Sequence, residues 1–75
     1  MDTTLGKLRP GTRAVVISLS GQGSPRRLAE MGLTPGTPVV VERSAPFGDP
    51  VVVSLRGYEL TLRRREADAV IVKRT

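Results

Sequence analysis

Two nearly identical phrases limit what this 75-residue chain can fold into. "LRPGT" occupies residues 8–12 and "LTPGT" occupies residues 33–37, and each leads into a run of apolar, mostly valine residues. In a type II turn, proline at the second position sets φ to about −65°, and glycine at the third accepts the positive φ that follows. Each phrase therefore predicts a tight turn that starts a β-strand. A repeat protein needs about three stacked units, and the phrase has no third copy, so the duplication indicates turn chemistry used twice.

Alternation of apolar and polar residues predicts five short strands, each with one apolar face. These strands are expected at residues 12–20, 38–44, 50–57, 59–63 and 69–73. The side chains expected to face the core are Val15, Ile17, Leu19, Val39, Val41, Val51, Val53, Leu55, Leu60, Leu62, Val70 and Val72. Val40, Val52 and Ile71 fall on the opposite faces, so we expect them to lie outside the core.

The clearest helix sequence lies between the first two strands. Ser24 is a suitable N-cap, and Pro25 suits the first helical position. Gly32 can adopt the left-handed conformation that ends a helix, with Leu33 behind it as the accompanying hydrophobic contact. We therefore expect a short helix that begins at Pro25 and ends just before Gly32.

Residue spacing gives this helix two different faces. Leu28 and Met31, three residues apart, are expected to face the core. Arg26 and Glu30, four residues apart, are expected to form an ion pair on the exposed side.

The order of the predicted elements indicates the fold. Single helical turns are expected at residues 3–8 and 64–69, and the whole order is that of an SH3-like barrel, in which closure leaves few exposed strand edges. An OB-fold is the rival, but it usually has longer strands and places its helix between the third and fourth strands. We expect residues 1–75 to form a single domain that is mainly β. Its predicted architecture is a small SH3-like five-stranded barrel with one short α-helix and one or two single helical turns.

The chain has neither cysteine nor histidine. It therefore lacks a disulfide, a thiolate nucleophile and the usual imidazole base. Zinc and ferrous iron normally bind His or Cys, so any metal would have to be held by oxygen alone. Glu66 and Asp68 are close in sequence, but three arginines at residues 63–65 precede them, which indicates ion pairs. We predict no enzymatic activity, no catalytic or metal-site residues and no cofactor.

Twelve basic residues against seven acidic ones give the chain a net charge of +5. Such a charge suits nucleic acid, an anionic membrane surface or an acidic protein face. Aromatic residues make up only 3% of the chain, which is few for stacking against unpaired bases, and the arginines are scattered along the sequence. Non-specific nucleic-acid binding is therefore the alternative function and not the main one.

No apolar run approaches the roughly 18 residues that a membrane span requires. The N-terminal residues also lack the apolar stretch of a signal peptide. We expect a cytoplasmic protein without membrane insertion.

Docking on another protein is the function that these exclusions leave. "APFGDP" at residues 45–50 holds Phe47 between two prolines, whose rigidity would keep the ring outward. The alternative is that the ring folds back as a lid on the barrel. A small barrel with an outward aromatic ring and an arginine-bearing helix would suit an adaptor.

The segment "RLAEMGLTPGTPVVVERSAPFGDPVVVSLRGYELTLRRREADAVIV", residues 27–72, resembles the ferrous-iron transport protein A (FeoA) family. The opening "TLGKLRPGTRAVVISLSGQG", residues 4–23, is also similar to the start of that family. The resemblance implies an SH3-like barrel that serves as an accessory factor of bacterial ferrous-iron uptake. Its implied partner is the cytosolic G-protein domain of the membrane permease FeoB.

The resemblance also implies weak transition-metal binding, because family members are often catalogued as binding such metals. A separate hypothesis from the residues themselves is metal sensing through carboxylates such as Glu42, Asp49 and Glu59. For docking on the permease, the helix face and the "APFGDP" loop are the expected contacts. The expected contact residues are Arg26, Arg27, Glu30, Met31, Pro46, Phe47 and Gly48.

Overall fold

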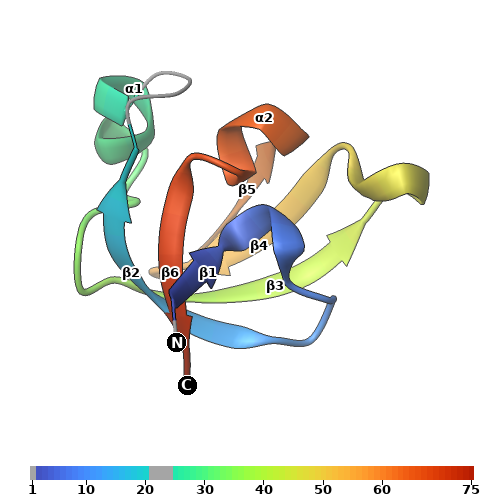
Figure 1. Ribbon diagram of the computed structural model, residues 1–75, viewed down its shortest axis with the longest axis horizontal. Coiled ribbons are helices and arrows are strands. Elements are labelled where there is room, and N and C mark those ends of the chain that lie inside the picture. Colours follow the sequence, from blue (N-terminus) through green and yellow to red (C-terminus); the bar gives the residue numbers. More distant parts are fainter. Residues whose placement is uncertain (1, 21–24) are drawn as a thin grey trace.

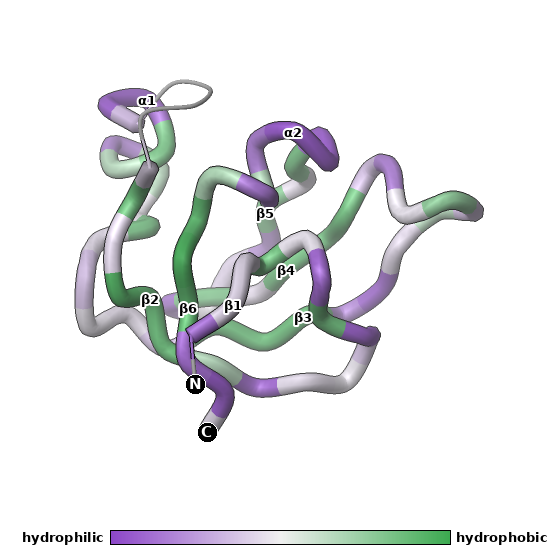
Figure 2. Tube along the Cα trace, viewed as in Figure 1, coloured by the Kyte–Doolittle hydropathy of each residue, from purple (hydrophilic) through white to green (hydrophobic). Residues whose placement is uncertain are grey.

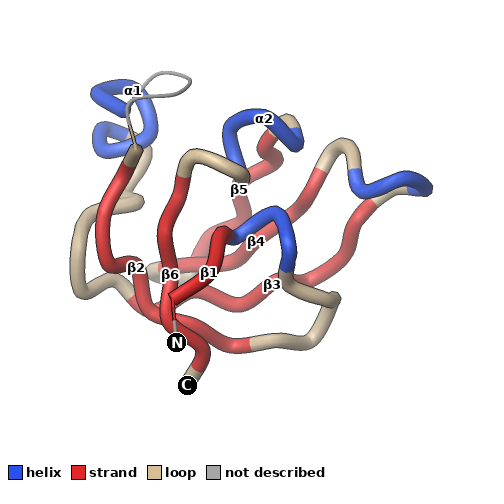
Figure 3. The backbone as a smooth tube through the Cα atoms, in the orientation of Figure 1, coloured by secondary structure: helices blue, strands red, loops and turns tan. Residues whose placement is uncertain are grey.

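Six antiparallel strands form one curved sheet in the computed structural model, which describes residues 2–20 and 25–75 (Figure 1). Short helices lie between the strands (Figure 3). In chain order the elements are β1 (Asp2–Thr4), the 3-10 turn η1 (Leu5–Lys7), β2 (Arg13–Leu19), α1 (Pro25–Glu30), β3 (Pro38–Ser44), the 3-10 turn η2 (Pro46–Gly48), β4 (Val51–Leu55), β5 (Tyr58–Leu62), α2 (Arg64–Ala67) and β6 (Val70–Arg74). The mainly β class, the α-helix and the helical turns near residues 3–8 and 64–69 are confirmed.

The strand count of five is wrong by one. Residues Asp2–Thr4 form β1, which pairs with β6 in a register that sets Thr3 opposite Val72. The sequence of β1 carries no apolar alternation, so its strand conformation depends on the partner strand and not on a local pattern.

The strands follow one another in the sheet as β1-β6-β2-β3-β4-β5, so β1 and β5 are the two edges. Across the described residues, no hydrogen-bonded pairing joins β1 to β5. Instead, η1, which follows β1, packs on α2, which follows β5. These helical turns cover the core on the side between the two edge strands.

Both Pro-Gly phrases form the predicted turns. The Thr12 amide donates to the Arg9 carbonyl at 3.1 Å, and the Thr37 amide donates to the Thr34 carbonyl at the same distance. The glycines between them have φ of 91° at position 11 and 89° at position 36. These are the positive values that a type II turn requires at its third position.

The two phrases pair with each other, which explains why the sequence contains the phrase twice. The Gly11 amide donates to the Val41 carbonyl at 2.6 Å, and the Gly36 amide donates to the Val16 carbonyl at 2.8 Å. Val16 and Val41 hold the same place in their respective phrases. Each turn thus extends the β2–β3 ladder by bonding to the middle residue of the other phrase's strand, and the two turns are related by an approximate local two-fold axis.

One hydrophobic core lies inside the curve of the sheet, where the apolar strand segments meet (Figure 2). The faces predicted for the later strands are confirmed, with Leu60 half-buried against the core and the other members fully buried. Those buried members are Val39, Val41, Val51, Val53, Leu55, Leu62, Val70 and Val72. Val40, Val52 and Ile71 are half-buried and outside this core cluster, as expected.

The face predicted for β2 is wrong at Val15 and Ile17 and correct at Leu19. Ala14 and Val16 are buried, whereas Val15 is half-buried and Ile17 is 40% exposed. The register shifts between Val16 and Ser18, after which Leu19 packs against the core. Residues 14–17 are apolar on both faces, so alternation could not indicate which face is buried, and the bulge changes the alternation within the strand.

Helix α1 begins at Pro25, as predicted, while its predicted N-cap, Ser24, lies outside the described residues. The Leu33 amide donates to the Leu28 carbonyl at 3.1 Å, and the Gly32 amide donates to the Ala29 carbonyl at 3.0 Å. With φ of 103° at Gly32, these two bonds form a Schellman motif. The predicted end of the helix is therefore confirmed, including the burial of Leu28 and Leu33.

Candidate docking surfaces

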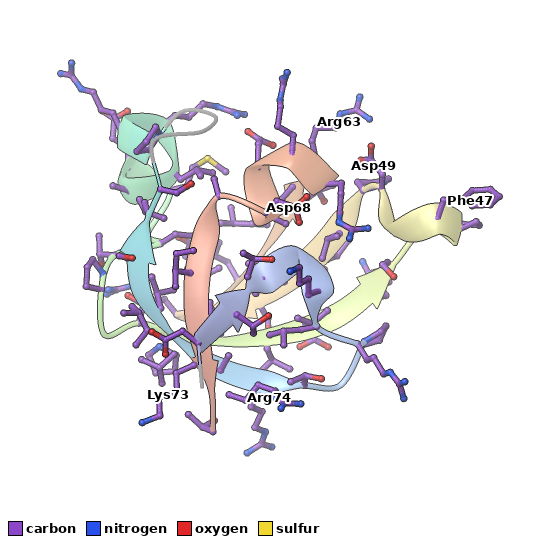
Figure 4. The ribbon with its side chains drawn as sticks, in the orientation of Figure 1. Phe47, Asp49, Arg63, Asp68, Lys73 and Arg74 are labelled. Atoms are coloured by element: carbon purple, nitrogen blue, oxygen red, sulfur yellow. The ribbon has the colours of Figure 1, made fainter. Side chains whose placement is uncertain are left out.

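The turn η2 presents the most exposed aromatic ring among the described residues. Phe47 is 99% exposed, and Figure 4 shows its side chain pointing away from the body of the molecule. The outward orientation is therefore confirmed, and the lid interpretation is wrong. We call Pro46, Phe47 and Gly48 the aromatic tip.

The backbone of the aromatic tip holds the ring in place. Phe47 has φ of 69° and ψ of 11°, which is the left-handed region that bulky residues rarely adopt. Such a residue costs about 1–3 kcal/mol and persists only where neighbouring structure fixes it. Here the Gly48 amide donates to the Ala45 carbonyl at 2.9 Å, and the Ala45 amide donates to the Pro50 carbonyl at 3.0 Å. The ring is thus presented by a constrained turn.

The aromatic tip is attached to α2. The Asp49 carboxylate accepts the backbone N–H of Arg64 at 3.2 Å and lies 4.0 Å from the Arg63 guanidinium. A Cβ added to Gly48 would lie 2.6 Å from Nη1 of Arg64, so this guanidinium rests directly on the glycine backbone. Two arginines therefore lie beside the loop that carries Phe47 (Figure 4).

Arg64 also links the tip to the N-terminal turn. Its Nε donates to Oδ1 of Asp68 at 3.2 Å, and that carboxylate lies so close to Gly6 of η1 that no Cβ would fit there. Through Arg64 and Asp68, η1 and α2 thus form a common base beside the aromatic tip.

The exposed face of α1 is the second predicted contact. Arg26 and Glu30 are exposed, but the ion pair predicted between them is not present among the described residues. Arg27 instead pairs with Glu66 of α2. Glu66 is only 9% exposed and also accepts the Arg63 amide at 2.9 Å. A buried carboxylate requires a cationic or hydrogen-bonding partner, which explains why the arginine nearest α2 is the one engaged.

The C-terminal end of α1 is tied to the β4–β5 hairpin. The Tyr58 hydroxyl donates to the Met31 carbonyl, and Arg56 Nη2 donates to the Thr37 hydroxyl at 2.9 Å. Met31 itself is half-buried against the core, as predicted, so little of its side chain is available to a partner. Sequence reasoning missed this role of Tyr58; its place directly after the Gly57 turn is the signal that could have indicated it.

The two groups of predicted contact residues lie on different sides of the molecule. In Figure 1, α1 is at the upper left and the aromatic tip, drawn in yellow, is at the far right. The fold does not bring them together, so they are two separate surfaces.

The carboxylates considered for metal binding are engaged with other groups. Glu42 accepts the Ser54 hydroxyl at 2.6 Å, Glu59 pairs with Arg43 at 3.1 Å, and Asp49 contacts α2. Within residues 2–20 and 25–75, no three His, Cys, Asp or Glu side chains are grouped closely enough to hold a metal ion. Over the same residues, no helix has the length and apolar character needed to cross a membrane.

Comparisons with known proteins identify the family. The FeoA domain family matches residues 3–74. The chain is 36% identical over 70 residues to an Fe(2+) transport protein A/Fe(2+) transporter FeoB fusion protein of Porphyromonas gingivalis; the match covers 92% of this chain but only 8% of that protein.

Solved structures agree with this family match. A FeoA-like protein from Clostridium acetobutylicum has a TM-score of 0.89 and 32% identity, over 97% of this chain and 86% of the other. Stenotrophomonas maltophilia FeoA complexed with zinc, described as a procaryotic SH3 domain protein, has a TM-score of 0.83 and 33% identity, over 95% and 89%. The chain therefore belongs to the FeoA family of non-enzymatic accessory proteins of ferrous-iron transport.

Proposed function

We propose that this protein is a cytoplasmic adaptor of ferrous-iron uptake that docks on the cytosolic G-protein domain of a FeoB-type permease. The fusion protein of Porphyromonas gingivalis supports this partner, because it joins protein A and the FeoB transporter in one chain. Joining two binding partners in one chain raises their effective concentration, which is useful when separate chains associate weakly. The chain spans only 8% of that relative, so the partner is part of the proposal.

We also infer that the curved sheet acts as the SH3-like barrel expected from the sequence. Contacts between η1 and α2 would close the side between β1 and β5 in place of a strand pairing. Such a scaffold keeps the aromatic tip and α1 at fixed positions on its surface.

The aromatic tip is the proposed main contact, and the exposure of Phe47 is the observation that carries it. Burying one phenylalanine side chain in a partner contributes about 1.5–3 kcal/mol. Aromatic and arginine side chains dominate the energetics of many interfaces, and here Arg63 and Arg64 lie beside the ring's loop. The complementary site on the permease would be an apolar pocket with carboxylates at its rim.

The exposed face of α1 is the proposed second contact, through Arg26, Arg27, Glu30 and the accessible part of Met31. Arg26 and Glu30 have no ion-pair partner within the described part of the chain, so both can pair with a bound protein. Rim charges of this kind chiefly change association rates and contribute little affinity.

The test is a titration of the purified cytosolic domain of the FeoB-type permease with wild-type protein and single variants. Phe47→Ala is expected to weaken binding by at least about tenfold, because it removes a buried aromatic contact. Ile17→Ala is the matched control, since it removes another exposed apolar side chain from a different element, and it should bind like the wild type. Wild-type protein that fails to bind would reject the partner, whereas equal binding by Phe47→Ala would reject the tip as the contact.

A further inference from the structure

The positive charge of this protein is concentrated at one end of the molecule. Five basic residues, which we call the basic end, lie there, and Asp2 is the acidic residue that lines a depression with two of them. The members of the basic end are Lys7, Arg9, Arg13, Lys73 and Arg74. The rest of the chain has seven basic and six acidic residues, so the basic end together with Asp2 carries four of the five net positive charges.

The fold gathers these residues from two distant parts of the sequence, residues 7–13 and residues 73–74. Lys7 and Arg74 line one shallow depression together with Asp2, Thr3 and Leu8. Lys73 lies directly across from Asp2 in the β1–β6 pairing. Figure 4 shows Lys73 and Arg74 at the bottom of the molecule, well away from Phe47, and Figure 1 places both chain termini at that end.

The two remaining arginines reach the same end through β2 and its preceding turn. The Thr75 amide donates to the Arg13 carbonyl at 3.1 Å, which sets the start of β2 beside the end of β6. Arg9 lies in the first Pro-Gly turn, between Leu8 of the depression and Arg13.

No member of the basic end forms an ion pair among the described residues, although Asp2 lies across from Lys73. All four ion pairs of the described residues involve arginines elsewhere, namely Arg27, Arg43, Arg63 and Arg64. Each member of the basic end is exposed and forms no ion pair with another described residue. Folding thus leaves this end with a net positive charge, which is available to an external anion.

We propose that the basic end binds an anionic lipid surface, with a lipid phosphate held between Lys7 and Arg74. The cations are spread over one end around a shallow depression, which suits a flat, densely charged surface better than a single small anion. At physiological salt the screening length is about 8 Å. The molecule measures 27 × 26 × 23 Å, so only the end that faces the lipid would be attracted. Binding would therefore orient the protein on the membrane.

Nucleic acid fits the basic end less well than a lipid surface. Single-stranded nucleic acids stack their bases on aromatic rings. Both aromatic side chains of this chain lie away from the basic end. Phe47 is on the aromatic tip, and the Tyr58 hydroxyl donates a hydrogen bond to the Met31 carbonyl. The proposal stands on the charges of this chain and can be tested without the permease. If the proposed docking is correct, however, it would bring the protein to a membrane.

The experiment is co-sedimentation of the full chain with vesicles of phosphatidylcholine alone or of equal parts phosphatidylcholine and phosphatidylglycerol. The wild type is expected to bind only the anionic vesicles and to be released by high salt. Each basic residue near such a surface contributes about fivefold in affinity, so Lys7→Gln/Arg74→Gln should bind about 25-fold more weakly. The control Arg26→Gln/Arg65→Gln removes the same two charges from exposed arginines that form no ion pair among the described residues. It should lose less than about threefold.

Several outcomes would overturn the proposal. Equal losses of vesicle affinity in the two double variants would show that only the net charge of the protein matters. Equal binding of the wild type to neutral and anionic vesicles would show that charge does not drive the binding. If the protein still binds a single-stranded oligonucleotide at a salt concentration that releases the vesicles, the basic end would be assigned to nucleic acid. Loss of binding to the permease domain by Lys7→Gln/Arg74→Gln, without vesicle binding by the wild type, would assign it to protein. Each substitution replaces an exposed charged residue by uncharged glutamine. Melting curves would confirm that each variant folds.

Discussion

At the scale of single residues, two side chains take on roles that their neighbours in sequence do not share. Arg26 and Arg27 are adjacent, yet only Arg27 reaches a buried carboxylate. Phe47 is apolar, yet it is the most exposed large hydrophobic residue described. The role of Arg27 depends on the element that lies opposite it, and the role of Phe47 depends on the turn that holds its backbone, so the residue type alone determines neither.

Arg27→Ala should destabilise the protein because it leaves Glu66 without its cationic partner. A hydrogen bond to a charged group contributes about 1.5–3 kcal/mol, but the Arg27 side chain is 61% exposed, so screening lowers the expected loss to about 1 kcal/mol. Urea unfolding would measure it. Arg26→Ala is the matched control, with an expected change below about 0.5 kcal/mol. Equal effects of the two substitutions would show that the Arg27–Glu66 pair does not stabilise the fold.

At the scale of elements, the two Pro-Gly turns and the β2–β3 ladder form one unit. Each turn bonds to the middle of the opposite strand, so a defect in either turn should affect both strands. The short helical elements η1 and α2 also form one unit, because η1, which follows β1, contacts α2, which follows β5.

Gly11→Ala and Gly36→Ala should therefore destabilise the protein by similar amounts. An L-residue forced into the left-handed region costs about 1–2 kcal/mol, and an added Cβ at either glycine meets no atom within 4 Å, so backbone strain alone should determine the loss. Thermal and urea unfolding would measure both variants. D-alanine at position 36, introduced by chemical synthesis, accepts the positive φ and should be nearly neutral. A loss with D-alanine as large as with L-alanine would contradict the strain argument.

At the scale of the whole molecule, the scaffold presents three separate surfaces: the aromatic tip, the exposed face of α1 and the basic end (Figure 4). Their separation would allow one small protein to contact a permease and a membrane at the same time. None of the three has the residues of a strong metal site, because the chain has no His or Cys and its candidate carboxylates bind other groups.

Calorimetric titration with ferrous or manganous ion should accordingly give only weak heat. Borderline transition metals bind tightly to imidazole and thiolate, and isolated carboxylates give dissociation constants of about a millimolar. Magnesium in excess should compete this heat away. A saturable site of micromolar affinity would contradict the prediction and would require ligands from more than one chain.

The sequence by itself determined those features whose causes lie within a few residues. Pro-Gly dictates the two turns, Gly32 ends α1, and the two-residue side-chain period, anchored by polar residues within or directly after the apolar runs, assigns the faces of β3 to β6, because each depends on local backbone conformation or side-chain period. The lack of His and Cys likewise needs no structure to exclude their chemistry.

Only the tertiary structure decided the features that need a distant partner. β1 is a strand because β6 pairs with it. Ala14 lies in a run that is apolar on both faces, and its pairing with β3 and β6 decides that it faces the core. Arg27 finds Glu66 across 39 residues of sequence, and the chain's two ends and the first Pro-Gly turn meet to form the basic end. Local patterns give the conformation of each segment, but long-range packing decides which segments become neighbours, and the proposed docking and lipid-binding surfaces depend on those neighbours.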